Sequence, residues 1–401
     1  MTARRAPGRA AFVFIFVTVC LDMLALGVIV PVLPTLVVQL EHGDYARAAS
    51  ITGVFGLAWA AMQFVFSPVL GILSDRYGRR PVVLLSNFGL GVDYVVMALA
   101  PNIPWLFLGR VVSGITSASF PTATAYIADV TEPEKRAARF GMLGAAFGLG
   151  FVVGPAVGGL LGNVSLRLPF WVSAGLSLTN AAYGLFVLPE SLPKEKRSQA
   201  SFAKANPFGS LELLRAPGLV ALAVASFFYF LAHESLPSTF VLYTQYRYHW
   251  TERTTGIALA IVGITSAIVS AALVGRFVSS LGERGALLLG LVAGCAGFVV
   301  FGLAPTTLLF MLGIPVDALF GLSGPTMQSL MSARIDASAQ GRLQGALSSM
   351  RGVTGMIGPI LFTQVFARSL GARVPGAAFV VAGALVLASA LIVVASRRRA
   401  A

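Results

Sequence analysis

Charged residues are scarce in this chain. Asp, Glu, Lys and Arg together make up 11% of its 401 residues, against about 25% in soluble globular domains. Hydrophobic residues make up 56%, more than the roughly 45–50% of a soluble domain. The apolar residues gather in runs of about 20, the length that crosses a bilayer core as a helix, and the short alternating strands of a membrane barrel are absent. The sequence therefore predicts an all-α integral membrane protein.

Other absences narrow the function. The only two cysteines, Cys20 and Cys295, lie inside apolar runs and are interpreted as packing residues, not as a disulfide or metal site. The sequence has no GxxxxGK[ST] phosphate loop, so ATP hydrolysis by this chain is not expected. It also has no metal-ligand cluster and no nucleophile–base constellation. An intramembrane enzyme or receptor is therefore the weaker alternative, and no cofactor is predicted.

Twelve apolar runs are predicted to span the membrane. They cover residues 11–39, 50–73, 82–100, 104–129, 139–162, 168–188, 217–246, 254–279, 285–304, 306–333, 342–367 and 375–396. Of the 29 Lys and Arg residues, 21 fall on the side of the N-terminus, six on the other side and two inside the runs. This excess places both termini in the cytoplasm by the positive-inside rule. The net charge of +13 is then a signal of topology and not of nucleic-acid binding.

The second half of the chain repeats the first at a constant offset of 204 residues. Ten identities fall on this offset: Gly71/Gly275, Gly78/Gly282, Arg80/Arg284, Gly109/Gly313, Pro121/Pro325, Thr122/Thr326, Gly141/Gly345, Gly148/Gly352, Gly154/Gly358 and Pro155/Pro359. We predict a six-helix half at 1–188, a cytoplasmic linker at 189–216 and a second six-helix half at 217–401. Six spans per repeat give both halves the same orientation, as in parallel-repeat transporters.

The segment 71–81, GILSDRYGRRP, joins the second and third spans on the cytoplasmic side. Its glycines permit a tight turn and a close helix approach, and an aspartate among three arginines is suited to a charge-assisted cluster that holds a gate. A plain turn with basic anchors is the alternative. The residues that carry the gating hypothesis are Gly71, Asp75, Arg76, Gly78, Arg79 and Arg80. The matching loop, 275–285, has Ser279 where the first half has Asp75.

The fifth span contains GLGFVVGPAVGGLLG. Glycines recur there at every fourth position (Gly150, Gly154, Gly158 and Gly162), so they line one helix face and admit a neighbouring backbone, while Pro155 adds a local bend. GILSDRYGRRP resembles the signature loop of the major facilitator superfamily, and this glycine-rich segment resembles the motif of its drug/proton antiporters. The resemblance implies the major facilitator fold, with 12 transmembrane helices in two six-helix halves, and it suggests a hinge or seal at Gly154, Pro155 and Gly158.

Within that superfamily, the first half is most similar to the tetracycline/proton antiporter group. The segments LDMLALGVIVPVLPTL, SDRYGRRPVVLLS, DYVVMA and GRVVSGIT share its character, and the resemblance covers most of residues 15–165. It implies proton-driven export of a cationic or zwitterionic drug-like molecule. Two departures are visible: Ser266 stands where the group has a membrane His, and Gly294 where it has an Asp.

Ionisable residues inside the spans are the candidates for the site. A mid-helix Asp or Arg costs about 2.5–3.5 kcal/mol on insertion scales, so each is expected to face protein or a water-filled cavity. By resemblance, spans 1, 4, 7 and 10 line the central cavity. We assign proton coupling to Asp22, Arg110, Glu234 and Asp317, substrate binding to His233, Glu234, Asp317 and Phe240, and gating also to Asp93. Arg351 is a further ionisable residue with no evident partner. In one arrangement Asp22 pairs with Arg110, and access to one side of the membrane changes the protonation of the pair. The alternative is a static ion pair.

The interpretation is a proton-coupled antiporter that exports amphipathic drug-like molecules, tetracycline-like ones included, by alternating access. A major facilitator that works as a symporter or uniporter for a small metabolite is the alternative. The expected setting is the bacterial cytoplasmic (inner) membrane, with the lipid bilayer, protons and a small molecule as partners, the proton gradient as energy source, no nucleic acid and a monomeric state. Such a protein would act in drug efflux and antibiotic resistance.

Overall fold

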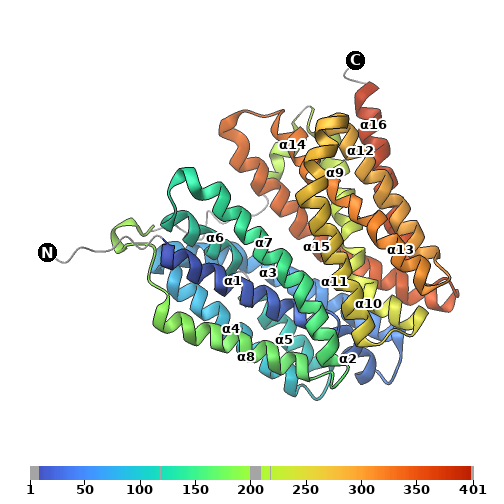
Figure 1. The fold of residues 1–401 in the computed structure, drawn as a ribbon, viewed down its shortest axis with the longest axis horizontal. Coiled ribbons are helices and arrows are strands. Elements are labelled where there is room, and N and C mark those ends of the chain that lie inside the picture. Colours follow the sequence, from blue (N-terminus) through green and yellow to red (C-terminus); the bar gives the residue numbers. More distant parts are fainter. Residues whose placement is uncertain (1–8, 118, 199–208, 217, 399–401) are drawn as a thin grey trace. The chain divides into compact units, whose positions relative to one another are not determined.

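The computed structural model describes the chain except for residues 1–8, 118, 199–208, 217 and 399–401. The described part is helical and contains no β-strand (Figure 1). It divides into two compact units. The first unit is Met1–Leu36 with Ala58–Asn206, and the second is Val37–Leu57 with Pro207–Ala401.

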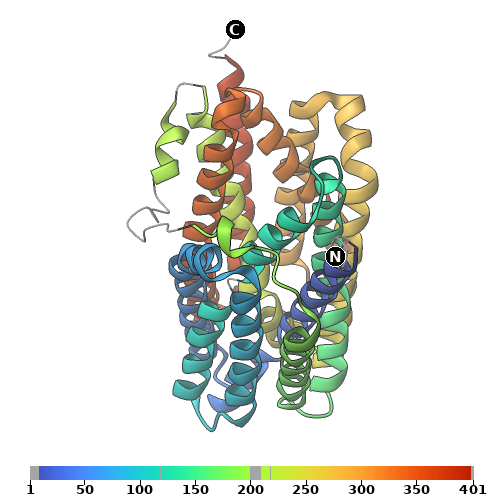
Figure 2. The same ribbon diagram turned by 90° about the vertical axis from the view of Figure 1, so that its left-hand side faces the viewer.

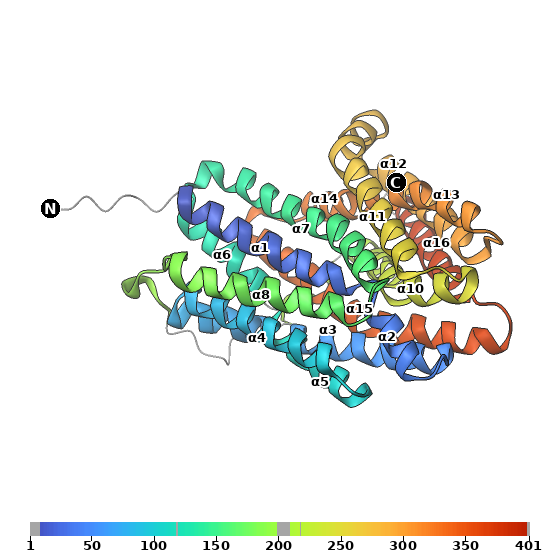
Figure 3. The ribbon, with the colours of Figure 1, turned by 60° about the horizontal axis from the view of Figure 1, so that its bottom comes forward.

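The first unit contains the predicted spans 1 and 3 to 6 with the second part of span 2. Its helices are α1 (Arg9–Ile29), the start of α2 (Leu33–Leu40), the end of α3 (Tyr45–Tyr77), α4 (Arg79–Leu99), α5 (Ile103–Thr116), α6 (Ser119–Val130), α7 (Pro133–Gly162) and α8 (Leu168–Val187), followed by the short helix η1 (Lys194–Lys196). Helix α1 packs against α7 and α8, and α4 packs against α8, α5 and α6. Figure 3 shows α1 and α7 running side by side.

The second unit holds the remaining spans. Its elements after the first part of α3 are η3 (Gly209–Arg215), α9 (Val220–His233), α10 (Ser235–Tyr248), α11 (Glu252–Ile268), the π-helical segment η4 (Val269–Leu273), α12 (Val274–Leu303), α13 (Thr307–Ala318), η5 (Leu319–Leu322), α14 (Ser323–Ser332), η6 (Ala337–Ala339), α15 (Gln340–Gly371) and α16 (Ala377–Arg398). Helix α16, red in Figure 2, packs against α9 and α12, and α15 packs against α9 and α10.

The helices account for the predicted number of spans. Ten described segments are long and apolar enough to cross a membrane. One of them, Glu252–Leu303, is 52 residues long and contains two spans, because Gly282 interrupts it with a non-helical φ of 72°. Span 4 is formed by α5 and α6, which flank residue 118. The prediction of an all-α membrane protein with twelve spans is confirmed.

Four spans are interrupted, and in each a proline lies four residues after a residue of the break. A proline has no N–H to bond the carbonyl four residues earlier, and its ring crowds that carbonyl. The residues four before these prolines fall where the helices break: Val30 before Pro34, Ser117 before Pro121, His233 before Pro237 and Gly321 before Pro325. The interrupted spans are 1, 4, 7 and 10, the set expected to line the cavity.

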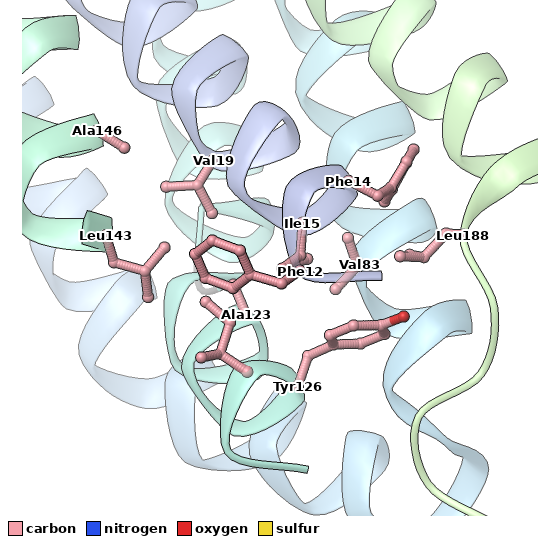
Figure 4. Close-up of a cluster of buried hydrophobic side chains, with 11 residues drawn as sticks. Phe12, Phe14, Ile15, Val19, Val83, Ala123, Tyr126, Leu143, Ala146 and Leu188 are labelled. Carbon is pink, nitrogen blue, oxygen red and sulfur yellow. The ribbon is translucent and has the colours of Figure 1, made fainter. Parts of the chain in front are cut away.

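Apolar packing fixes one end of the first unit. Phe12, Ile15 and Val19 of α1 form a buried cluster with Tyr126 of α6, Leu143 of α7 and the neighbouring side chains shown in Figure 4. The cluster joins helices from both ends of this unit's sequence. It therefore holds α1 in a defined rotation about its axis.

Candidate functional site

Asp22 lies on α1 and is 7% exposed. The Asn180 side-chain nitrogen, on α8, donates to its Oδ1 over 3.0 Å and also to the Thr18 carbonyl over 3.1 Å. The Asn87 amide of α4, oriented with its nitrogen toward the carboxylate, donates to Oδ2 over 3.0 Å. Both asparagines are buried. Three helices thus converge on a single carboxylate that has two amide partners.

Arg110 on α5 does not pair with Asp22 in this structure. Its electrostatic partner is the buried carboxylate of Asp93 on α4, and its guanidinium carbon lies 5.5 Å from the centre of the Trp59 ring. The absence of a side chain at Gly109 leaves room for Asp93, because a Cβ on Gly109 would lie 2.8 Å from Asp93 Oδ1. The polar groups expected to form one pair therefore form two separate sites in the first unit.

The glycine face of α7 meets the helix that carries Asp22. A Cβ on Gly154 would lie 2.6 Å from the Gly27 Cα, and one on Gly150 would lie 2.5 Å from the Met23 Cβ. A Cβ on Gly158 would collide with the Val28 carbonyl oxygen. The close backbone approach predicted for this face is present, and its partner is α1.

The loop 71–81 forms a charge cluster around Arg79. Its guanidinium pairs with Asp75 and, over 3.1 Å, with Asp129 at the end of α6. Its backbone N–H donates to Glu190 over 2.9 Å, while Arg80 donates to the Leu185 carbonyl over 2.5 Å. These contacts tie the start of α4 to the ends of α6 and α8.

The other residues of this loop behave differently. Gly78 has a φ of 110°, which an L-residue rarely adopts. Gly71 lies inside α3, and a Cβ there would meet no described atom within 4 Å, so the close approach expected at Gly71 is not present in this conformation. Arg76 lies over its neighbour Tyr77, 5.5 Å from the ring centre.

The two carboxylates proposed in the second unit sit against glycines. A Cβ on Gly358 of α15 would lie 2.7 Å from the Cγ of Glu234, which stands in the break between α9 and α10. A Cβ on Gly297 of α12 would lie 2.7 Å from the Asp317 Cβ. Asp317 is 8% exposed, and its Oδ1 has no hydrogen-bond partner among the described residues.

The two remaining substrate-binding candidates are placed differently. The His233 ring lies parallel to that of Phe320, 6.5 Å away. Phe240 is 2% exposed and packs into an aromatic cluster with Phe310 at 5.5 Å and Trp250 at 6.2 Å. Gly294 also packs against Phe320, whose Cγ would lie 2.7 Å from a Cβ at that position. This α12 position therefore has no room for a carboxylate unless the Phe320 ring moves.

Sequence reasoning missed the two asparagines. Amides within apolar spans are themselves a polar signal, but nothing along the chain shows that Asn87 and Asn180 face the same carboxylate. Asp129, the last residue of the predicted span 104–129, and Glu190, in the predicted linker, likewise carried no signal of a shared partner. Their convergence depends on helix packing and has no local pattern.

A model of the Major Facilitator Superfamily matches residues 15–359, which include the broken spans, the loop around Arg79 and the glycine face. The chain belongs to the major facilitator superfamily. Its membership makes the protein a multi-pass membrane transporter and not an enzyme.

Two relatives within the superfamily are tetracycline resistance proteins. The class C protein of Escherichia coli is 37% identical over 381 residues, 94% of this chain and 94% of that protein. The class G protein of Vibrio anguillarum is 36% identical over 368 residues, 91% of this chain and 92% of that protein. The suspected relationship of this major facilitator to tetracycline resistance proteins is confirmed.

The fold is also found in a solved structure. The human organic anion transporter MFSD10 (TETRAN) superposes with a TM-score of 0.70 at 23% identity, over 97% of this chain and 100% of that one. At this identity the likeness concerns the fold alone, and it agrees with the family match.

Proposed function

We propose that this major facilitator is a proton-coupled antiporter that exports amphipathic drug-like molecules, with tetracycline among the candidates, by alternating access. The observation that carries the proposal is the buried Asp22 carboxylate with its two amide partners. The relatives named as tetracycline resistance proteins support the substrate class. The alternative, a symporter or uniporter for a small metabolite, predicts a different response to the proton gradient.

Amide partners suit a group that must gain and lose a proton. A carboxylate fixed to a guanidinium is held in its charged form, because protonation would leave the cation unpaired in a medium of low dielectric constant. An amide stabilises a carboxylate by donation and, after rotation, accepts a hydrogen bond from the neutral acid. Asn87 and Asn180 therefore accommodate both states of Asp22.

The antiport cycle follows from competition at this carboxylate. A proton from outside neutralises Asp22 and favours release of a cationic substrate; loss of that proton to the cytoplasm restores the charge that attracts the next substrate molecule. The helix interface between α1 and α7 lies within one turn of Asp22, since Gly150 contacts Met23. Sliding or opening at this interface would change the environment of Asp22.

We assign supporting roles as follows. Arg110, Glu234 and Asp317 take part in proton coupling, Glu234 and Asp317 also bind substrate, and Asp93 acts in gating. His233 and Phe240 of the second half bind substrate. The loop 71–81 and the glycine face of α7 act in gating. The functional halves are 1–188 and 217–401, joined by the linker 189–216.

The proposed setting is the bacterial cytoplasmic (inner) membrane, with both termini in the cytoplasm and a monomeric protein. The excess of Lys and Arg on one side of the spans supports this orientation.

The test is transport into proteoliposomes under a pH gradient of imposed direction, with tetracycline and a panel of other amphipathic molecules. An antiporter accumulates substrate when the lumen is acidic, because outward proton flow then drives uptake. A symporter accumulates it when the outside is acidic, and a uniporter equilibrates it under either gradient. Accumulation driven only by an acidic exterior, or the same final level in both, rejects antiport.

A further inference from the structure

The chain that follows α8 is folded against the first unit. We call residues 189–198 the strap; they are the start of the predicted linker and contain the short helix η1. Leu192, in the middle of the strap, is buried. The strap also contacts the loop 71–81, which lies 111 residues away along the chain at the closest bond. A segment that only joined two halves would need neither of these features.

Glu190 of the strap completes the start of α4. That helix begins at Arg79, and the preceding Gly78 has no side chain that could accept a hydrogen bond from the first N–H groups. The Glu190 Oε1 accepts from the Arg79 N–H over 2.9 Å and from the Leu192 N–H over 3.0 Å. A carboxylate is favoured at this place, because the first N–H groups of a helix lack partners and carry a partial positive charge. Glu190 therefore caps a helix that has no cap of its own.

The loop 71–81 has room for this carboxylate because residue 78 is a glycine. A Cβ on Gly78 would collide with the Glu190 carboxylate and would lie 2.9 Å from a guanidinium nitrogen of Arg197. Arg197 closes the strap, since it donates to the Leu192 carbonyl over 3.4 Å and lies 3.8 Å from the second oxygen of Glu190. Gly78 is thus required for the space it leaves as well as for its φ of 110°.

Two more hydrogen bonds tie the strap to the partners of Arg79. The Ser191 hydroxyl donates to Asp129 Oδ2 over 3.1 Å, and the same oxygen pairs with the Arg79 guanidinium. The Ser198 N–H donates to the Asp75 carbonyl over 3.1 Å. The strap is therefore bonded both to the loop and to the end of α6. If the loop moves away from α6, the strap loses either its bonds to the loop or its bond to Asp129.

The repeat shows that the strap is not a consequence of the shared scaffold. At the offset of 204, Glu190 corresponds to Val394 near the end of α16, and Arg79 corresponds to Glu283. The second unit thus has an acidic residue directly after Gly282 at the start of its own helix, where the first unit has an arginine. The carboxylate of Glu190 has no counterpart at the matching position.

We infer that the strap is a moving part of the gate, and that Glu190 is the positioning residue that holds the loop 71–81 in the conformation of this structure. Each transport cycle then releases the strap and binds it again. The inference rests on the proposed function in one respect, that the loop 71–81 acts in gating. Glu190 acts through the loop and takes no part in binding the proton or the substrate.

The first test measures whether Glu190 holds the strap. Trypsin cleaves after Arg197 only when the guanidinium leaves its partners, and cleavage follows the population of this open form. Purified full-length protein in nanodiscs is digested, and the new N-terminus at Ser198 is quantified by mass spectrometry. We expect Glu190→Gln to be cut there about fivefold faster than the wild type, because both N–H groups and Arg197 lose a charged acceptor. Glu190→Asp, which keeps the charge on a shorter side chain, should lie between them.

Glu134→Gln is the matched control for this digestion. It removes an exposed carboxylate from the first turn of α7 and should be cut after Arg197 at the wild-type rate. Ser191→Ala is a second variant that removes only the bond to Asp129, and it should be cut about twofold faster than the wild type. Wild-type rates in folded Glu190→Gln and Ser191→Ala proteins would overturn the inference.

The second test distinguishes a moving part from a static anchor. Proteoliposomes that contain the wild-type protein are digested from outside at one external pH, with tetracycline present and with the lumen either acidic or alkaline. Uptake and cleavage after Arg197 are measured in parallel on the molecules whose strap faces outward. We expect cleavage to be about twofold faster under the lumen pH that drives uptake, because cycling molecules release the strap. Glu190→Gln should show no such dependence.

The two proposals fail in different ways. Uptake driven by an alkaline lumen rejects antiport, and the inference about the strap then requires that cleavage rise under that same condition. Uptake driven by an acidic lumen with equal cleavage under both conditions leaves antiport in place and rejects the strap as a moving part.

Discussion

The two repeats share a scaffold but hold their buried carboxylates differently. In the first unit, Asp22 receives amides from α4 and α8. At the offset of 204, its counterpart is Ser226, and that of Asn87 is the buried Leu291. The last span of the second unit contacts α9 through Ser389, which donates to the Ala225 carbonyl over 2.9 Å. The first unit makes a similar bond, from Ser173 of α8 to the Ala25 carbonyl of α1 over 2.8 Å. The units therefore differ in the carboxylate with its two amides, which only the first unit has at this place.

A second difference concerns spans 3 and 4 and their counterparts 9 and 10. Asp93 on α4 faces the α5 glycine Gly109. The offset places Gly297 at the Asp93 position and Asp317 opposite it on α13, where the two pack together. Each unit therefore keeps one carboxylate at this helix crossing, contributed by opposite helices. The scaffold conserves the place of the charge but not the residue that supplies it.

The largest effect is expected when the carboxylate of Asp22, which has no counterpart at the matching position of the second unit, is removed. Asp22→Asn should reduce gradient-driven transport to background in proteoliposomes, because the amide cannot exchange a proton. Asp336→Asn, an exposed loop substitution, is the matched control and should transport normally. Asp317→Asn should retain part of the flux; an equal loss there would mean that the two units share the proton. Unchanged coupled flux in Asp22→Asn would remove that residue from the mechanism.

A large effect on stability is expected at the glycine face. Gly154→Val places a side chain against the α1 backbone, and overpacking of this kind costs about 1–3 kcal/mol, occasionally more. Gly144→Val on the same helix controls for helix propensity, because a Cβ at that position would meet no described atom within 4 Å. Gly358→Val, at the matching position of the second unit, should lie between them, since Glu234 can turn aside. Thermal unfolding of the purified variants should rank them in that order.

The amide partners should have a moderate effect. Asn180→Ala leaves Asp22 with one fewer donor, and losing a hydrogen bond to a charged group costs about 1.5–3 kcal/mol. Ser389→Ala removes a neutral hydrogen bond between α16 and α9 of the second unit, worth about 0.5–1.5 kcal/mol. We therefore expect lower transport and a lower melting temperature in Asn180→Ala than in Ser389→Ala. The reverse order would contradict the assignment of Asn180 to Asp22.

The smallest effect is expected in the charge cluster around Arg79. The Arg79–Asp129 pair is partly exposed, and such pairs contribute about 0–1 kcal/mol. Arg79→Gln should lower the melting temperature at low salt, and the difference should shrink at high salt because ions screen the pair. Arg76→Gln, which removes an arginine outside the cluster, should show no such salt dependence. In the second unit, Glu283 instead accepts a hydrogen bond from the neutral Ser329 hydroxyl over 2.5 Å. The melting temperature of Ser329→Ala should therefore depend less on salt concentration than that of Arg79→Gln.

Much of the fold was predictable from the sequence because the patterns that indicate it are local or periodic. Apolar length gave the spans, and the repeat placed Gly78 and Gly282 at the same left-handed position, with φ values of 110° and 72°. Arg80 and Arg284 also act alike, since each donates to a backbone carbonyl of its unit's last helix. The glycine spacing of α7 predicted a close approach, although the partner helix was not named.

The sequence predicted which residues belong to the site but not which of them contact one another. The sequence by itself determined which residues are ionisable within a membrane span, because an isolated charge in an apolar run is visible without any structure. Tertiary packing alone decided that Asp22 meets two amides, that Arg110 faces Asp93, and that Arg351 lies over Phe230. These partners are separated by up to 158 residues along the chain, and only the rotation of each helix about its axis decides which polar groups meet.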